Sequence, residues 1–186
     1  STTWYVGELS NWEVGNVTTF TQMFSNAAFS ANEFNIGDIS GWDVSKSTSF
    51  YGMFSASGYN ANTWYIGTLS TWDVSSSTDF SYMFNIAGYN SSGVTLDVTN
   101  WDVSNATNLS YMFRNMAFST GTSNIGDLSN WNVSKVTNFR SMFQSVGKNN
   151  TSIDIGNLDR WDTSSGTNMR GMFNFLGNGA TSFNIG

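Results

Sequence analysis

Residues 101–113, WDVSNATNLSYMF, decide the fold because close copies of this stretch occur along the whole chain. WEVGNVTTFTQMF begins at Trp12, WDVSKSTSFYGMF at Trp42 and WNVSKVTNFRSMF at Trp131. The leading tryptophans of the six copies lie at positions 12, 42, 72, 101, 131 and 161, so the intervals are 30, 30, 29, 30 and 30 residues. A fixed period of this length predicts stacked repeats, each too small to bury its apolar side chains alone.

Composition and charge limit what these repeats can do. Of the 186 residues, 39% are hydrophobic, 16% are aromatic and 11% are charged, which predicts a folded domain and not a disordered chain. The sequence has no cysteine, histidine or proline, which excludes thiolate and imidazole metal sites, Cys or His nucleophile chemistry, and disulfides. The acidic residues are spread along the repeats without a non-repeated neighbour. We therefore expect no enzyme activity and no cofactor.

The net charge and hydropathy also bear on partners. A formal charge of −6 argues against binding to nucleic acid, because that affinity rests largely on Lys and Arg. No apolar run approaches the roughly 18 residues of a membrane span, so we expect none. The chain begins STTWYVG, with neither an initiator Met nor a signal-peptide apolar region, which predicts a processed product or a window from a longer protein.

Two segments of each period are predicted to be short strands. Leu9, Trp12 and Val14 follow the L-x-x-L-x-L strand pattern of leucine-rich repeats, with Trp in the second apolar slot. The second segment precedes a glycine corner, as in EFNIG at 33–37 and TWYIG at 63–67, where apolar and polar residues alternate. Each repeat is therefore expected to contain two strands.

A short helix is predicted between these strands. Phe20, Met23 and Phe24 have the i, i+3, i+4 spacing that places side chains on one helical face. A threonine precedes each such group, where its hydroxyl would satisfy a free amide of the first turn. These candidate N-caps are Thr18, Thr48, Thr78, Thr107, Thr137 and Thr167.

The sequence therefore predicts one domain over residues 1–186, an α/β repeat solenoid of about six 30-residue coils in which equivalent side chains stack. The repeats are expected to start near Gly7, Gly37, Gly67, Asp97, Gly126 and Gly156. Because Leu96-Asp97 stands where other repeats have an aliphatic residue and Gly, we expect that the 29-residue interval reflects a deleted corner glycine. Two columns are expected in the core: Trp12, Trp42, Trp72, Trp101, Trp131 and Trp161, and Met23, Met53, Met83, Met112, Met142 and Met172.

The motif carries a family resemblance. WDVSNATNLSYMF and WNVSKVTNFRSMF resemble the W-D-V-S-N-V-T-N-M-x-x-M-F repeat of BspA-like leucine-rich-repeat surface proteins of microbes, over essentially the whole chain. The period exceeds the usual length of about 25 by an insertion, as in AAFSANEFNIG at 27–37. The resemblance implies a leucine-rich-repeat-like fold and a cell-surface, adhesive or unassigned role, and it implies no catalytic residue.

An acidic column is predicted next to the tryptophans. Asp43, Asp73, Asp102 and Asp162, with Glu13 and Asn132, should lie one above another, where like charges destabilise each other. We favour the interpretation that each carboxylate accepts hydrogen bonds from the backbone or from the serine two residues on. The alternative is calcium held between coils by the four aspartates. Because Asn132 interrupts the series, we expect that a chelator leaves the melting temperature unchanged.

Other surface features give binding alternatives. Phe29, Tyr59, Tyr89 and Phe118 could form an aromatic strip for glycans or proteins. The tryptophans would be a sugar platform if they faced outward, and the threonine column could order ice if it did not cap helices. Of the N-x-S/T sequons, those in the variable loops are the plausible glycosylation sites: Asn90, Asn149 and Asn150.

The sequence favours a non-enzymatic, extracellular, structural or adhesive surface protein that assembles end to end. Neither terminus shows the polar capping repeat that solenoids need. Residues 1–110 hold nine acidic and one basic side chain, whereas residues 111–186 hold four acidic and six basic ones, so opposite ends would attract. A head-to-tail contact that does not close gives a filament. The expected partner is another copy or a longer parent solenoid, with glycans or host surface proteins as alternatives.

Overall fold

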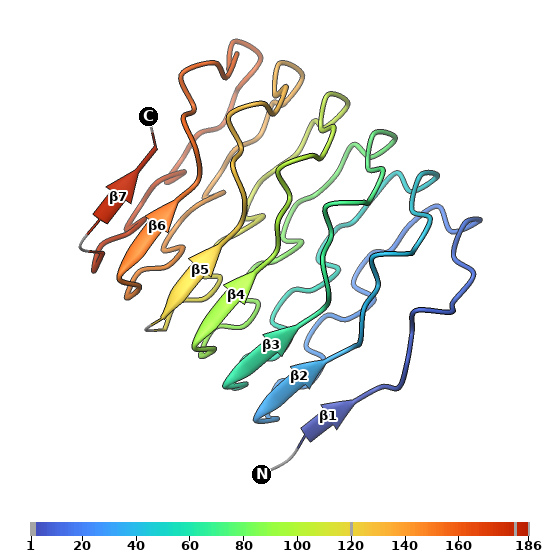
Figure 1. The fold of residues 1–186 in the computed structure, drawn as a ribbon. Helices are drawn as coiled ribbons and strands as arrows, with labels where there is room; N and C mark the ends of the chain where they lie inside the picture. The colour runs from blue at the N-terminus through green and yellow to red at the C-terminus, as the bar shows by residue number, and fades with distance from the viewer. Residues whose placement is uncertain (1–2, 120, 181, 186) are drawn as a thin grey trace.

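The computed structural model describes residues 3–119, 121–180 and 182–185, which form a stack of coils with β1 and β7 at opposite ends (Figure 1). Each coil contributes one three-residue strand. The strands are β1 (Thr3–Tyr5), β2 (Glu33–Asn35), β3 (Thr63–Tyr65), β4 (Gly93–Thr95), β5 (Thr122–Asn124), β6 (Ser152–Asp154) and β7 (Ser182–Asn184). They form two parallel sheets, β1-β2-β3 and β4-β5-β6-β7, in sequence order. Neighbouring strands pair through equivalent positions of successive repeats, as where Phe34 of β2 pairs with Trp64 of β3.

The segments predicted to be helices are runs of consecutive turns, and the described residues contain no helix. Within a run, one amide donates to the carbonyl three residues earlier, as from Met23 N to Phe20 O (3.2 Å). The alternate amides donate to the next coil, as from Phe24 N to Met53 O (2.8 Å). Residues such as Gln22 and Asn26 have left-handed φ values of 55° and 58°, which a helix does not contain.

The prediction of an α/β, leucine-rich-repeat-like solenoid is therefore wrong, as is that of a helix and two strands per coil. The segment containing Leu9, Trp12 and Val14 forms turns and irregular backbone, with Trp12 N donating to Leu9 O (3.0 Å). The i, i+3, i+4 spacing misled because successive turns also bring such residues to one side. No described helix could cross a membrane.

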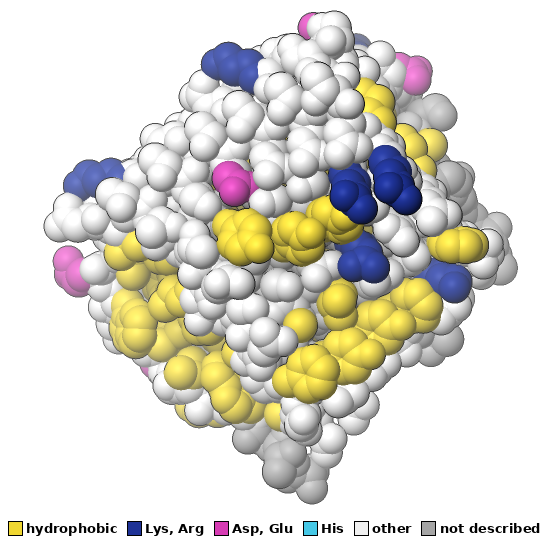
Figure 2. Space-filling model, turned by 180° about the vertical axis from the view of Figure 1, so that it is seen from behind, with side chains coloured by type: hydrophobic (Ala, Val, Ile, Leu, Met, Phe, Trp, Pro, Cys, Tyr) yellow, Lys and Arg dark blue, Asp and Glu magenta, His cyan; other side chains and the backbone are white. Residues whose placement is uncertain are grey.

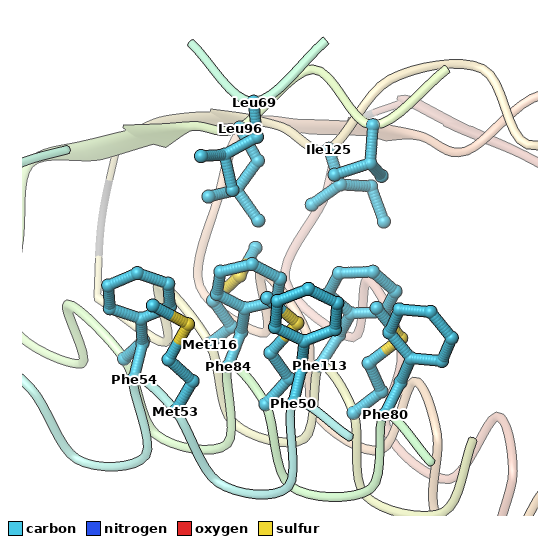
Figure 3. Close-up of a cluster of buried hydrophobic side chains, with 14 of the residues drawn as sticks. Phe50, Met53, Phe54, Leu69, Phe80, Phe84, Leu96, Phe113, Met116 and Ile125 are labelled. Atoms are coloured by element: carbon cyan, nitrogen blue, oxygen red, sulfur yellow. The ribbon is translucent and has the colours of Figure 1, made fainter. Parts of the chain in front are cut away.

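The core consists of columns of like side chains. Phe54, Phe84 and Phe113 stack with ring centroids 5.5 and 5.8 Å apart, and all three are buried (Figure 3). Leu96 and Ile125 approach from the opposite wall of the coil (Figure 3). Burial of this apolar surface is the main stabilising contribution, and it depends on contact between coils.

The fourth coil corrects the interpretation of the short interval. Asp97 has a left-handed φ of 49° and so takes the corner position that Gly67 holds with a φ of 77°. Trp101 N then donates to Val98 O (3.2 Å) as Trp72 N donates to Leu69 O (3.1 Å). The corner residue is therefore retained as aspartate, and the residue that is missing is the polar one that follows it.

Candidate functional surface

The tryptophan column lies inside the stack. Trp42, Trp72, Trp101 and Trp131 are each 3% exposed, and their indole Nε1 atoms donate to backbone carbonyls such as Leu69 O (2.8 Å from Trp101). Stacking on both sides accounts for this burial, since the exposed fraction of Trp12, which stacks on Trp42 alone, is 51%. Trp161 is partly buried. The four buried tryptophans therefore cannot serve as a sugar platform.

The methionine column follows the same rule. Its inner members are fully buried: Met53, Met83, Met112 and Met142. Met172 is 7% exposed and Met23, in the first coil, is 38% exposed. These thioethers fill space beside phenylalanines, where a soft and flexible side chain packs well.

Phe29, Tyr59, Tyr89 and Phe118 lie in one column on the surface. Their ring centroids are 4.6, 4.9 and 4.6 Å apart, and the planes are nearly parallel. The pKa of Tyr89 is raised mainly by partial burial and, to a smaller extent, by the neighbouring Tyr59. Because the rings cover one another's faces, the column offers mainly ring edges. A sugar that stacks on an open aromatic face finds little room in this strip.

A second aromatic column escaped sequence analysis. Tyr82 and Tyr111 stack at 4.5 Å, and Tyr51 meets Tyr82 edge to face at 5.8 Å. The guanidinium carbons of Arg114 and Arg140 lie 5.6 and 5.3 Å from the Tyr111 ring centre. The column was missed because Tyr51 and Tyr82 occupy adjacent positions of the repeat, so their spacing is 31 residues.

Charge is divided unevenly between surfaces. We define the turn face as the six turn runs with their flanking residues, 20–31, 50–61, 80–91, 109–119, 139–150 and 169–180. None of the thirteen acidic residues lies in these runs, which contain Arg114, Arg140, Lys148 and Arg170. Figure 2 shows Lys and Arg side chains beside rows of hydrophobic side chains on one side of the molecule, where an acidic side chain also borders one of these rows. The turn runs themselves are therefore cationic and aromatic in this acidic protein.

The acidic column is exposed and hydrogen-bonded locally. Asp43 Oδ1 accepts from Ser45 Oγ (2.6 Å) and Ser45 N (3.1 Å), and Asp73 and Ser75 repeat the arrangement. Asn132 accepts from Ser134 in the same way, which explains how an amide can replace a carboxylate there. Within the described ranges, no three acidic side chains are placed to hold a metal ion.

Replacing Ser45 by alanine is expected to raise the pKa of Asp43 toward its ordinary value. The hydrogen bond from the Ser45 hydroxyl is the main cause of the low pKa of Asp43, and the hydrogen bond from the Ser45 amide adds to it. Because the folded pKa lies below the unfolded one, the ionised carboxylate stabilises the fold above the unfolded pKa. This contribution is lost as the pH falls through the folded pKa. NMR titration measures the change, with Asp162 as the internal control because its own donor, Ser164, remains.

A polar groove of about 700 Å³ lies over β4, β5 and β6, near the residue missing from the fourth coil. Asp97, Asp127 and Asp154 contribute to its lining. The pKa of Asp127 is lowered by a hydrogen bond from the Ser129 amide and, to a smaller extent, by one from the Ser129 hydroxyl, which both favour the ionised carboxylate. A glycosidase-type acid would need the opposite shift, so the groove does not favour acid–base catalysis through Asp127.

The threonine column is exposed and caps no helix, which corrects the N-cap assignment. Thr48 donates to Thr18 O from both its amide (2.9 Å) and its Oγ1 (3.2 Å), and Thr137 donates likewise to Thr107 O. Such bonds hold the hydroxyls of Thr48, Thr78, Thr107, Thr137 and Thr167 in a repeated orientation. The six side chains form one exposed row along the stack: Thr18, Thr48, Thr78, Thr107, Thr137 and Thr167.

The three candidate glycosylation sites differ in access. Asn90 and Asn149 are exposed, whereas Asn150 is 1% exposed and its Nδ2 donates to Ser123 Oγ (2.7 Å). In a host that adds N-glycans, we expect that Asn150 stays unmodified while Asn90 and Asn149 are open to modification. Peptide mass spectrometry after glycosidase treatment in oxygen-18 water identifies the modified asparagines. A glycan on Asn150 would contradict its burial.

The comparisons give a family without an assigned activity. The matching family model is described as Mycoplasma protein of unknown function, DUF285, and it matches residues 1–88, 58–154 and 114–185. No match was found to a curated protein or to a solved structure. Nothing in these comparisons links the chain to BspA-like leucine-rich-repeat proteins or to adhesion, so those interpretations of the motif are withdrawn. Because the matched segments together extend from residue 1 to residue 185, the chain belongs to the DUF285 family of unknown function.

Proposed function

We propose that this chain is a non-enzymatic structural protein of an extracellular surface, whose coil stack joins further coils of the same kind end to end. The observation that carries the proposal is the contrast between inner and outer coils. Phe84, Phe113 and Phe143 are fully buried, whereas Phe173, in the same column, is 42% exposed. At the other end, Trp12 and Met23 are similarly uncovered. Each end face thus offers apolar columns that another coil would continue.

Backbone geometry supports the same contact. The alternate amides of each turn run donate to the next coil, as from Phe143 N to Met172 O (2.9 Å). A coil laid on an end face would extend both this ladder and the apolar columns. Such a contact joins two unlike surfaces, and repetition of it produces an open filament. The excess of acid in residues 1–110 and of base in residues 111–186 favours the contact at low salt.

Light scattering and negative-stain microscopy at low salt test the proposal. We expect rods several molecules long, which shorten when Trp12 is replaced by glutamate because a charge then lies on the end face. Thr78→Glu places the same charge on the exposed side of an inner coil, and it should leave the rods intact. Compact monomers of the unaltered chain would overturn the proposal, and so would rods that the Trp12 variant does not affect.

Ice binding is a second candidate, which the exposed threonine column favours. Its hydroxyls are fixed by hydrogen bonds to the preceding coil, as from Thr167 Oγ1 to Thr137 O (3.0 Å). The row repeats at about 4.8 Å, the spacing of neighbouring strands. A regular array of hydroxyl and methyl groups could order water against a crystal plane.

Thermal hysteresis measures this activity directly. We expect that lysine at Thr78 and Thr107, in the middle of the row, abolishes it by interrupting the array. Thr122→Lys, on β5, adds an equally long charged side chain at an exposed site outside the row and should have no effect. Absence of hysteresis in the unaltered chain would remove this candidate.

A further inference from the structure

We propose that Arg114, Arg140 and Arg170 on the turn face bind the sulfate or carboxylate groups of an acidic polysaccharide. This inference goes beyond the structural role proposed above and does not depend on end-to-end assembly, because the residues lie on the side of the stack. It rests on the separation of charge, on two guanidinium groups gathered at one ring, and on buried polar atoms without partners.

The separation of charge is the first argument. The protein carries a net charge of −6, yet the turn face holds four cations and no acid. Among the described residues, no ion pair involves any of these four side chains. Lys46 and Lys135, which lie elsewhere, instead donate to Asn16 Oδ1 (2.8 Å) and Asn105 Oδ1 (2.7 Å). The cations of the turn face therefore remain available to an external anion.

The arrangement at Tyr111 is the second argument. Arg114 and Arg140 come from successive coils, and both guanidinium groups lie over this ring, whose other close neighbour is Tyr82 at 4.5 Å. Contact with the ring orients the cations, but it does not neutralise them. Two positive charges held at one ring repel each other, and a bound oxyanion removes that repulsion. Guanidinium is also the side-chain group whose geometry best matches sulfate or carboxylate.

Two buried atoms give the third argument. The donor Arg114 Nε and the acceptor Asn85 Oδ1 are buried, and neither has a hydrogen-bond partner. Asn85 and Arg114 occupy equivalent positions of the third and fourth repeats. Their coils are joined at this point by a hydrogen bond from Ile86 N to Arg114 O (2.8 Å). An oxyanion would accept from the arginine, while a neighbouring hydroxyl would donate to the asparagine. An acidic sugar supplies both groups, and the long Arg114 side chain can turn outward to meet it.

The direction of the stack explains why the ligand should be a polymer. Arg140 and Arg170 occupy the same place in successive coils, and Ser141 N donates to Arg170 O (2.9 Å). Lys148 continues the face, with Nζ 5.2 Å from the Phe118 ring centre and 5.0 Å from that of Phe175. A chain of acidic sugars lying along the stack would meet these cations in turn. Duplex DNA presents phosphate groups but no free hydroxyl that could donate to Asn85 Oδ1, so we expect it to bind more weakly than an acidic sugar chain.

Calorimetric titration at 50 mM salt tests the site with four probes: heparin, hyaluronate, neutral dextran and duplex DNA. Heparin presents sulfate and carboxylate groups, hyaluronate presents carboxylate alone, and dextran presents only hydroxyl groups. We expect binding of heparin, weaker binding of hyaluronate and none of dextran. The double variant Arg114→Gln/Arg140→Gln should weaken heparin binding at least tenfold. Arg140→Gln alone, which leaves the buried Arg114 Nε undisturbed, should weaken it by a smaller factor.

The matched control is Arg160→Gln, which removes the same charge from an exposed position outside the turn face. We expect that it changes heparin affinity less than twofold. Equal losses in the control and the double variant would reduce the effect to net charge and overturn the site, as would unchanged binding in the double variant. Dextran binding as tight as heparin binding, or tighter binding of DNA, would overturn the choice of ligand. Circular dichroism melting shows whether each variant is folded.

Discussion

Replacing Trp101 by alanine is expected to lower the free energy of unfolding by about 3 to 5 kcal/mol. The indole lies between Trp72 and Trp131, with ring centroids 6.4 and 6.5 Å away, and its exposed fraction is 3%. Removing it opens a cavity between two coils and also removes the hydrogen bond from Nε1 to Leu69 O. Urea denaturation followed by circular dichroism measures the loss.

Trp12→Ala is the matched control for that experiment. Its indole stacks on Trp42 alone and is 51% exposed, so we expect a smaller loss of about 1 kcal/mol from the apolar area it buries. A loss below about 1 kcal/mol at Trp101 would contradict its position between two coils. It would also support the alternative that the tryptophans face outward and stack on sugars.

Gly88→Val is the second substitution with a large expected effect, a destabilisation of about 2 to 5 kcal/mol. Gly88 has a left-handed φ of 52°, which a β-branched residue rarely adopts. A Cβ atom there would lie 2.8 Å from Val94 Cγ2 and 3.2 Å from Trp64 Cβ, so the side chain would also collide with its neighbours. Thermal melting measures the effect.

Gly52→Val separates the two contributions. Gly52 has a similar φ of 56°, but the nearest atom to an added Cβ is Gln22 Cγ at 3.3 Å, on a flexible side chain. This variant should therefore show mainly the backbone strain, of about 1 to 2 kcal/mol. Equal losses at Gly52 and Gly88 would show that the contacts at Gly88 are relaxed without cost.

The period could be predicted from sequence because each apolar residue stacks on its own counterpart 29 or 30 residues away. The local backbone could not, because the spacing of Phe20, Met23 and Phe24 is compatible with a helix and with consecutive turns. Only the destination of the alternate amides distinguishes the two, and those amides donate to another coil. Non-glycine residues such as Gln22 also adopt left-handed φ values that their side chains do not reveal.

The candidate surfaces also include one that the sequence could predict and one that it could not. Phe29, Tyr59, Tyr89 and Phe118 recur at the period, so sequence alone could place them together. The cluster of Tyr82, Tyr111, Arg114 and Arg140 could not be found in this way, because the two arginines come from two other positions of the repeat than the one that the tyrosines share. The absence of acids from the turn runs was visible in the sequence, but it had no meaning until those runs were known to form one face.

The missing residue of the fourth coil has a consequence for folding. In a chain of near-identical coils, any coil could dock on a non-adjacent one with little loss, and the stack would then omit the coils between them. The short segment after Asp97 makes one coil unlike the others. This coil nevertheless stays in register with both full-length neighbours, since Phe113 stacks on Phe84 and on Phe143. Folding therefore tolerates the loss of one residue at this corner, and the selection of the right neighbour rests on the direct chain connection between successive coils.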